Sequence, residues 1–248
     1  MDLVSFHTAL RRLTQEFGQS IDYEAILEKQ YSRLIGLDWK VLDIGAHSGR
    51  HTSVFARLAA RGSVLAVEPL PEQAEMLRAL RLPNVTVHQC AVSDKVGTSS
   101  FVHAQGTPEE SGLLQRIFNH PDRAKPKTIT VETRTIDTLM EGQPACNYIK
   151  MDIEGAELLA LRGAVRTLQR CRPIISIEYG YAGYSAYGQT QEEMFDFATS
   201  HGYLVTDIFG LPATTHGEWK LLSSGWTWDF FLVPLENAAG YLPLLQGN

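Results

Sequence analysis

The segment at residues 41–52, VLDIGAHSGRHT, decides the fold, because an apolar strand pattern runs through Asp43 and Gly45 to Gly49 and then into a helix pattern. In an open α/β sheet, ligands bind beyond the carboxyl ends of the strands, and glycine there lets the backbone approach a ligand closely. The spacing G-x-x-x-G is neither the dinucleotide fingerprint G-x-G-x-x-G nor a P-loop. Asp43 adds a carboxylate, which suits a hydroxylated or cationic ligand better than a pyrophosphate.

The sequence on both sides of this segment alternates short apolar strands with helices. Strands are expected at residues 40–44, 64–67, 85–88, 148–151, 173–177, 203–208 and 228–234, and helices at residues 51–61, 71–80, 156–169 and 191–201. This alternation predicts an α/β fold with a doubly wound, mostly parallel sheet that carries helices on both faces. The last two strands lack a clear helix between them, which predicts an antiparallel hairpin at one edge.

Length and charge limit the function classes. A chain of 248 residues fits one α/β domain and can bury a large core without disulfide or metal staples. The 28 acidic residues outnumber the 22 basic ones, for a net charge of −6. Nucleic acids and anionic membranes attract a positive field, so neither is expected as a partner.

Two amphipathic helices are expected before the first strand. Residues 3–17 repeat apolar side chains at helical spacing, and Ser20 or Asp22 can cap a second helix over residues 23–34. We expect them to cover the sheet; the alternatives are a lid or the contact of a homodimer. The predicted division is a helical cap at residues 1–38 and a larger domain at residues 39–248, in one compact unit.

The chain ends and the cysteines indicate a soluble, cytoplasmic protein. The N-terminus lacks the apolar core and cleavage site of a signal peptide, and the most apolar stretch, residues 230–245, is broken by prolines, a glycine and a glutamate. The cysteines are expected to be small buried apolar residues; they are Cys90, Cys146 and Cys171.

Two further strand ends are expected beside the first glycine-rich turn. Glu68 ends the next strand, where a carboxylate can accept hydrogen bonds from ribose hydroxyls. Cys90 and Ala91 follow the third strand, and such small residues can border a flat adenine ring. Together, these features predict a crevice that binds a nucleoside.

This trio resembles the class I S-adenosylmethionine-dependent methyltransferases, which have a Rossmann-like fold. The resemblance implies S-adenosylmethionine as cofactor, with Glu68 at its ribose and Ala91 and Val92 at its adenine. The residues that it places at the methionine and sulfonium end are Asp43, Gly45, Ala46, His47 and Gly49. His47 stands where Asn is common in that family, and its ring can replace the hydrogen bonds of Asn.

The segment at residues 147–164, NYIKMDIEGAELLALRGA, narrows the resemblance. Its K-x-D-x-E-G-x-E pattern resembles the hallmark of the FkbM methyltransferase family, as do the flanking segments AVSDKVGTSSF (residues 91–101) and VETRTIDTLM (residues 131–140). The resemblance covers residues 39–178. It implies an O-methyltransferase that acts on a hydroxyl of a small molecule such as a secondary metabolite or a sugar.

The predicted catalytic residues follow the fourth and fifth strands of this crevice. We expect Asp152 to remove or orient the acceptor proton, with Glu178 as its rival, and Lys150 to keep a neighbour ionised. Glu154 is a further candidate, although it and Glu157 could simply cap the next helix. Clustered carboxylates could also bind Mg²⁺, an alternative that we do not favour.

Expectations for the remaining segments and aromatic residues are less specific. Residues 103–127 lack periodicity and predict a long loop whose basic residues form a solvated face; these are Arg116, Arg123, Lys125 and Lys127. Residues 179–188, YGYAGYSAYG, could recognise a sugar or ring, or could plug the core. The tryptophans Trp219, Trp226 and Trp228 are expected to pack on the sheet, whereas His51 is expected to be structural and His216 to lie in a loop.

Three other functions stay open at this point. A methyltransferase that acts on RNA or protein is possible, although the acidic charge opposes RNA. A non-catalytic nucleoside-binding module would keep the same crevice. An NAD-dependent oxidoreductase is disfavoured by the missing third glycine.

Overall fold

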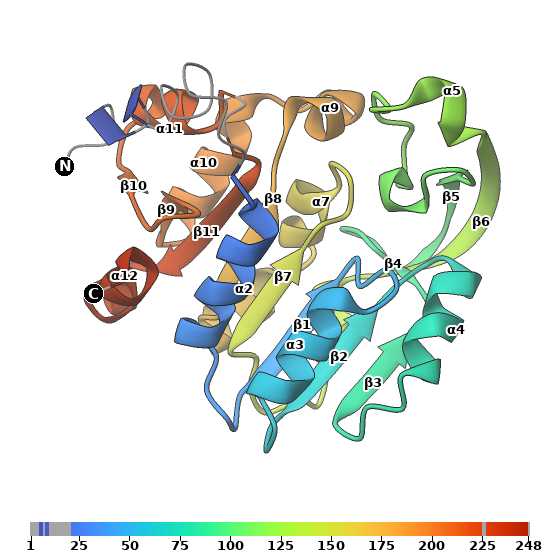
Figure 1. Ribbon diagram of the computed structural model, residues 1–248, viewed down its shortest axis with the longest axis horizontal. Coiled ribbons are helices and arrows are strands. Elements are labelled where there is room, and N and C mark those ends of the chain that lie inside the picture. The colour runs from blue at the N-terminus through green and yellow to red at the C-terminus, as the bar shows by residue number, and fades with distance from the viewer. Residues whose placement is uncertain (1–4, 7, 10–20, 225–226, 248) are drawn as a thin grey trace.

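The computed structural model describes residues 5–6, 8–9, 21–224 and 227–247, and its centre is an eight-stranded sheet (Figure 1). The strand order is β10-β9-β11-β8-β7-β1-β2-β3. The strands are β1 (Lys40–Ile44), β2 (Ser63–Val67), β3 (Val85–His88), β7 (Tyr148–Met151), β8 (Ile174–Glu178), β9 (Tyr203–Asp207), β10 (Pro212–Ala213) and β11 (Asp229–Pro234). The five strands β3, β2, β1, β7 and β8 are parallel, which confirms the predicted fold class.

The antiparallel part of the sheet is at the end that the sequence indicates. Strand β11 runs antiparallel to both β8 and β9, so it is inserted between them. The connection between β9 and β11 contains two elements that the sequence analysis missed, the edge strand β10 and helix α11 (His216–Leu222). Because β11 returns beside β8, its first residue lies at the same sheet edge as the last residue of β8.

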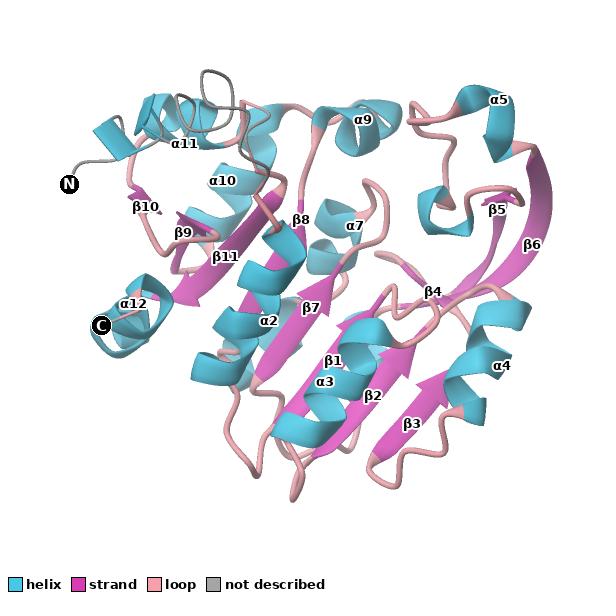
Figure 2. Ribbon diagram, viewed as in Figure 1, coloured by secondary structure: helices cyan, strands magenta, loops and turns pink. Residues whose placement is uncertain are grey.

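Helices cover both faces of the sheet, as Figure 2 shows. One face is covered by α2 (Tyr23–Leu34), α3 (Arg50–Leu58) and α12 (Ala238–Gln246), and α4 (Pro71–Ala79) packs beside β3. The other face is covered by α6 (Ile136–Leu139), α7 (Glu157–Arg162), α8 (Val165–Cys171), α10 (Gln191–Ser200) and α11. Short helices in the connections are η1 (Pro108–Glu110), α5 (Pro121–Ala124), α9 (Tyr181–Tyr184), η2 (Ser185–Tyr187) and η3 (Leu235–Asn237).

The helix predicted at residues 156–169 is wrong in one respect, since it is two helices. Helix α7 ends at Arg162, with Gly163 as its C-cap, and α8 begins at Val165. The backbone at Gly163 runs so close to Ser93 that a Cβ atom there would overlap the Ser93 carbonyl oxygen. This close approach holds the chain between the two helices against Ser93, which directly follows the strand at residues 91–92.

A second, three-stranded sheet lies beside the parallel one, and the sequence analysis did not predict it. It has the order β4-β6-β5, with β4 (Ala91–Val92), β5 (Gly97–Ala104) and β6 (Pro126–Arg134). Strands β5 and β6 pair antiparallel over eight residues each. Strand β5 is mostly polar, and the apolar alternation of β6 is limited to Ile129 and Val131, so the pair was not recognised from the sequence. The connection between them carries η1 and α5.

The second N-terminal helix is confirmed, whereas the first lies mostly outside the described residues. Asp22 caps α2, because its carboxylate accepts a hydrogen bond from the Ala25 backbone N–H at 2.9 Å. Tyr31 of α2 is fully buried, with its ring 4.8 Å from Phe55 and 5.8 Å from Tyr148. Helix α2 therefore covers the sheet, as expected. None of the described helices is long and apolar enough to cross a membrane.

The turn after β1 joins both neighbouring strands and sets the position of the site. The backbone N–H groups of Gly45 and Ala46 both donate to the Val67 carbonyl of β2, at 3.0 and 3.1 Å. On the other side, the N–H of Asp152, just after β7, donates to Ile44 at 3.1 Å. Gly45 has φ +79°, and a Cβ atom there would overlap the Asp152 carbonyl oxygen. Only glycine fits this turn.

Gly45→Ala should therefore lower the free energy of unfolding by about 2–5 kcal/mol, the sum of the left-handed backbone penalty and the cost of overpacking. Chemical denaturation measures this loss. The matched control is Gly240→Ala, since Gly240 is exposed in α12 and no atom lies within 4 Å of the added Cβ. That change should be neutral or stabilising by up to about 1 kcal/mol. Equal effects of the two substitutions would contradict the close approach.

Candidate active site

The main pocket lies at the carboxyl ends of β1, β2 and β7 and encloses about 610 Å³, part of it open to solvent. This size is ordinary for a small-molecule or cofactor site. We call it the crevice. Its lining residues come from the ends of these strands, from β4 and β5 and from the loop after β5: Ile44, Gly45, His47, Val67, Glu68, Pro69, Leu70, Cys90, Ala91, Val92, Phe101, Pro108, Glu109, Ser111, Leu113, Asp152, Ile153, Glu154 and Ala156.

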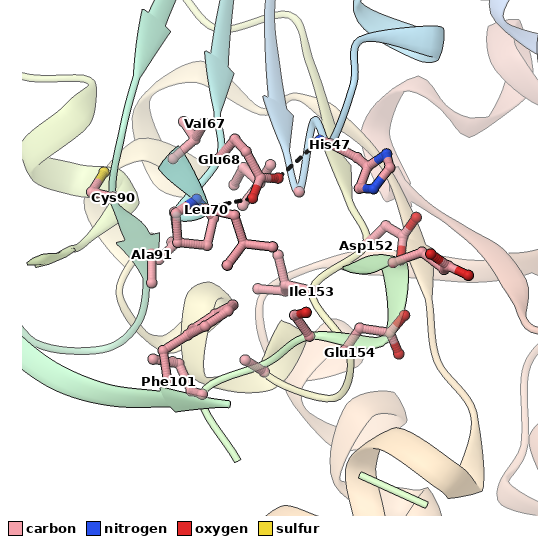
Figure 3. Close-up of a pocket in the computed structure, with 18 of the residues that line it drawn as sticks. His47, Val67, Glu68, Leu70, Cys90, Ala91, Phe101, Asp152, Ile153 and Glu154 are labelled. Carbon is pink, nitrogen blue, oxygen red and sulfur yellow. Dashed lines mark hydrogen bonds between the residues drawn. The ribbon is translucent and has the colours of Figure 1, made fainter. Parts of the chain in front are cut away.

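Glu68 supplies a carboxylate to the wall of the crevice, as Figure 3 shows. One carboxylate oxygen accepts from the His47 N–H and the other from the Leu70 N–H, both at 2.9 Å. Burial raises the pKa of Glu68 to about 7, although these two hydrogen bonds act to lower it. Each oxygen keeps a lone pair for a further donor, so Glu68 is placed to accept hydrogen bonds from ligand hydroxyls.

The turn that carries His47 presents backbone and ring to the same crevice. His47 has φ +48°, an unusual value for a residue with a side chain, and its N–H bond to Glu68 stabilises that conformation. Its ring Nε2 is buried without a hydrogen-bond partner. Burial lowers the pKa of His47, so the ring is neutral at pH 7. A ligand bound in the crevice could supply the hydrogen bond that this nitrogen lacks.

Three of the residues predicted to bind the cofactor do not line the crevice, and their part in binding stays a prediction. Asp43 is fully buried behind the turn, where one carboxylate oxygen accepts from the Thr52 hydroxyl at 2.5 Å. Its other oxygen has no partner. Ala46 packs against the apolar cluster under α4, and Gly49 lies against Leu77 of that helix. These residues shape the turn, whereas Gly45 and His47 reach the crevice.

The opposite wall of the crevice is apolar, which suits a flat ring. Ala91 and Val92 line it, as predicted, and both are buried. Phe101 of β5 and Leu70 add larger surfaces, and in Figure 3 Phe101 stands across the crevice from Glu68. Phe101 was not among the predicted site residues, because the strand that carries it was not predicted. Its place in the FkbM-like segment 91–101 was the available signal.

Asp152 and Glu178 form a carboxyl pair with Lys150 at the far end of the crevice. The Lys150 ammonium lies 3.0 Å from Asp152. Burial acts to raise the pKa of Asp152, but the charge of Lys150 and hydrogen bonds from Glu178 and Lys150 outweigh it, so this pKa is lowered. Burial and the charge of Asp152 raise the pKa of Glu178 well above its usual range. Glu178 therefore keeps its proton to a higher pH than Asp152 does.

A third carboxyl group, Asp229, adjoins this pair and was missed in the sequence. It begins β11 directly opposite Glu178 in the strand register. Burial and the charge of Asp152 raise its pKa to about 7. A lone Asp after a tryptophan carries no sequence signal, and only the insertion of β11 beside β8 brings it here. Lys150 is thus the cation shared by several buried carboxyl groups, which agrees with the prediction that it keeps a neighbour ionised.

Glu154 forms a buried ion pair with Arg116, and this finding corrects two expectations. The side chains are 11% and 9% exposed. Arg116 is therefore not part of a solvated face, whereas Arg123, Lys125 and Lys127 are exposed as expected. The charge of Glu154 is compensated, which argues against a role as catalytic base.

The expectation that a carboxylate caps the helix after β7 holds for Glu157 and not for Glu154. Glu157 is the first residue of α7, and its carboxylate accepts from the Ile153 N–H at 2.8 Å. Burial raises its pKa to about 7.

A second pocket of about 520 Å³ adjoins the crevice, and Glu154 lines both. We call it the side pocket. It opens between β7, β8, α9 and the connection that follows η1. Its other lining residues are Arg116, Asn119, Gly155, Glu157, Glu178, Gly180, Ala182, Gly183 and Trp228. Trp228 was expected to pack on the sheet, but its side chain is 50% exposed at this pocket; Trp219 is buried in the core, and Trp226 lies outside the described residues.

The remaining expectations concern metals, tyrosines and histidines. Within the described ranges, no group of three or more His, Cys, Asp or Glu side chains is placed to hold a metal, so the Mg²⁺ alternative gains no support. Tyr179 and Tyr184 stack at 4.7 Å and are buried core plugs. His51 pairs with Glu24 of α2 at 3.2 Å, a structural role. His216 was expected in a loop, which is wrong: it is the first residue of α11 and pairs with Asp196 at 2.7 Å on the surface.

The cysteines behave largely as expected. Cys90 and Cys146 are buried thiols, and Cys171 is partly buried. Burial raises the pKa of the Cys90 thiol to about 11, so it is not an activated nucleophile at neutral pH.

Comparisons with known proteins agree with this geometry. The methyltransferase FkbM domain matches residues 43–205. Among solved structures, the chain is similar to methyltransferase FkbM from Methylobacillus flagellatus KT, with 18% identity and a TM-score of 0.51; the match covers 93% of this chain and 59% of that one. This chain thus spans less than two thirds of the length of that protein. The shared fold is that of the Rossmann-like class I methyltransferases.

Two further solved structures show weaker similarity. One is a SAM-dependent methyltransferase from Aquifex aeolicus, with 14% identity, a TM-score of 0.44 and coverage of 94% of this chain and 97% of that one. The other is a putative rRNA methylase from Clostridium thermocellum, with 12% identity, a TM-score of 0.47 and coverage of 86% and 95%. Comparison with curated proteins finds no match. Because the FkbM domain matches about two thirds of the sequence, this chain belongs to the FkbM family of methyltransferases.

Proposed function

We propose that this protein is an S-adenosylmethionine-dependent O-methyltransferase that acts on a hydroxyl of a small molecule. The observation that carries the proposal is the position of Glu68. Its carboxylate, held by two backbone N–H groups, faces an apolar-walled crevice that continues to the carboxyl pair of Asp152 and Glu178.

The residues of the crevice fit this cofactor. Glu68 would accept hydrogen bonds from the ribose hydroxyls, while Ala91, Val92 and Phe101 would enclose the adenine. The Nε2 atom of His47, which has no hydrogen-bond partner, would gain a polar neighbour from the methionine end of the cofactor. When bound, S-adenosylmethionine supplies an electrophilic methyl group on a sulfonium centre.

The side pocket is the proposed site of the acceptor. It meets the crevice at Glu154, and Glu178 at its inner end is hydrogen-bonded to Asp152, which lines the crevice. An acceptor hydroxyl that enters through the side pocket would therefore reach the end of the crevice at which Asp152 lies. Holding the acceptor oxygen in line with the methyl carbon, at about 3–3.5 Å, can lower the barrier by about 7–11 kcal/mol.

The carboxyl pair handles the proton of the acceptor. Lys150 keeps Asp152 ionised, so Asp152 can accept a hydrogen bond from the hydroxyl and then its proton. Protonated Glu178 donates to Asp152 and orients it. Once Asp152 has taken up the proton, Asp229, whose pKa is about 7, is a further carboxyl group that can balance the charge of Lys150.

An RNA acceptor fits the side pocket poorly. Its lining contains three carboxyl groups and one arginine, and that arginine is already paired. Phosphate groups need unpaired cations at the site. A non-catalytic nucleoside-binding module would not need the carboxyl pair. Assays of labelled methyl transfer to hydroxyl compounds, to RNA and to protein distinguish a small-molecule methyltransferase, a macromolecule methyltransferase and a non-catalytic module.

The affinity for S-adenosylhomocysteine should fall as the pH decreases from 8 to 6. The raised pKa of about 7 means that Glu68 takes up a proton in this range, and a protonated carboxyl accepts ribose hydrogen bonds less well. The loss should approach tenfold per pH unit below 7. Calorimetry at several pH values measures it.

Glu68→Gln should remove this pH dependence and weaken binding at pH 8 by about 1–3 kcal/mol. Glu72→Gln is the matched control, because Glu72 is an exposed carboxylate on the adjoining helix α4. It should retain the affinity and pH dependence of the parent protein. An unchanged pH dependence in Glu68→Gln would remove Glu68 from the ribose site.

Asp152→Asn should lower methyl transfer by about 10²–10⁴-fold, because it removes the proton acceptor. Glu178→Gln should cost less than tenfold, since an amide still donates a hydrogen bond to Asp152. Rates are measured with labelled S-adenosylmethionine and the hydroxyl compound that the parent protein methylates. Both variants should bind S-adenosylhomocysteine normally; a larger loss for Glu178→Gln would make Glu178 the base.

A further inference from the structure

Four of the large apolar side chains that the structure exposes come from segments that meet at the side pocket. Trp228 is 50% exposed and lines the pocket itself. Tyr181, at 67%, and Ile117, at 57%, each adjoin a lining residue in sequence, and Leu114, at 46%, lies on the same connection as Ile117. Single exposed apolar residues are normal, but a group around one opening indicates a binding surface. We call these four residues the collar.

Hydrogen bonds to neighbouring segments hold the collar in place. The Ile117 N–H donates to the Ala182 carbonyl of α9 at 3.2 Å, and the Leu114 N–H donates to the Tyr187 hydroxyl at 3.2 Å. These bonds join the connection between β5 and β6 to α9 and η2. The collar is therefore assembled before any ligand arrives, which lowers the entropy cost of binding.

Trp228 is fixed from the other side of the opening. Its carbonyl accepts from the Tyr179 N–H at 2.7 Å. Its ring lies against Gly180, where an added Cβ atom would come within 2.6 Å of the ring Cδ1. Gly180 thus leaves room for an indole that stays half exposed. An aromatic ring held at a pocket mouth offers a flat apolar face to a ligand.

Behind the collar, the wall of the side pocket contains charged groups. These are the Arg116–Glu154 ion pair and the carboxyl groups of Glu157 and Glu178, none of which is exposed, whereas Asn119 adds an exposed amide. Ligand hydroxyls can both donate to and accept from such groups. From the mouth inward, the surface thus changes from apolar to strongly hydrogen-bonding. A wholly polar acceptor would leave the collar in water, and a wholly apolar one would strip water from buried charges.

We propose that the acceptor is an amphiphile: a hydroxylated head group enters the side pocket, and an attached apolar body lies on the collar. This inference rests on the proposed function, because it assigns the acceptor of the same site. Trp228, Tyr181 and Ile117 then determine specificity by contacting the apolar body, away from the reacting hydroxyl. The head group meets the Arg116–Glu154 pair and the carboxyl groups.

Calorimetry on the full chain saturated with S-adenosylhomocysteine tests this assignment. The probes are two series with different head groups, n-alkyl β-D-glucosides and 1-O-alkylglycerols, each from methyl to hexyl. A fully buried methylene is worth about fourfold in affinity, so partial burial on the collar should strengthen binding at least tenfold from methyl to hexyl. The increase should appear in at least one series.

Trp228→Ala and Ile117→Ser should each reduce this chain-length increase by about threefold or more. Leu235→Ser is the matched control: Leu235 is 62% exposed but follows the opposite end of β11 from Trp228, so the increase should persist. Normal binding of S-adenosylhomocysteine shows that each variant is folded.

Affinities that do not rise with chain length in either series, or no binding of any member, would overturn the amphiphilic acceptor. An increase that survives both collar substitutions would overturn the role of the collar. In these cases, intact binding of S-adenosylhomocysteine leaves the proposed cofactor site standing. A chain that binds neither S-adenosylhomocysteine nor the probes would instead refute the proposed function itself.

Discussion

The site depends on how the backbone leaves β1. At that point the chain is bonded to both neighbours, through two N–H groups that donate to Val67 and through the Asp152 N–H that donates to Ile44. Gly45 has no side chain, so the ends of β1 and β7 can approach until an added Cβ would overlap the Asp152 carbonyl. This contact places the cofactor wall and the candidate base on adjoining strand ends. It also turns His47 so that its N–H holds Glu68.

The parallel sheet could be predicted because its strands are short, apolar and separated by helix patterns. Residues 41–52 and 147–164 also carried the family resemblance. Glu68, Ala91 and Val92 could be placed in the crevice because strand ends meet at one edge of a parallel sheet. Asp43 does not line the crevice, because it is fully buried and accepts a hydrogen bond from Thr52, which sequence order alone does not show.

What the sequence could not show depends on long-range pairing. Strand β5 is mostly polar and the apolar alternation of β6 is short, so Phe101 was not recognised as a wall of the crevice. The Arg116–Glu154 pair joins residues 38 positions apart. Asp229 reaches Glu178 only because β11 inserts beside β8. In each case, a partner distant in the chain decides whether a charged or aromatic residue belongs to the site.

In the proposed function, the crevice holds the nucleoside and the adjoining side pocket holds the acceptor, with carboxyl groups at the junction. The most direct test is a crystal structure with S-adenosylhomocysteine bound. The account predicts the ribose at Glu68, the adenine between Ala91 and Phe101, and the sulfur toward Asp152, with the side pocket open beyond it. A ligand seated elsewhere, or one whose sulfur faces away from Asp152, would contradict it.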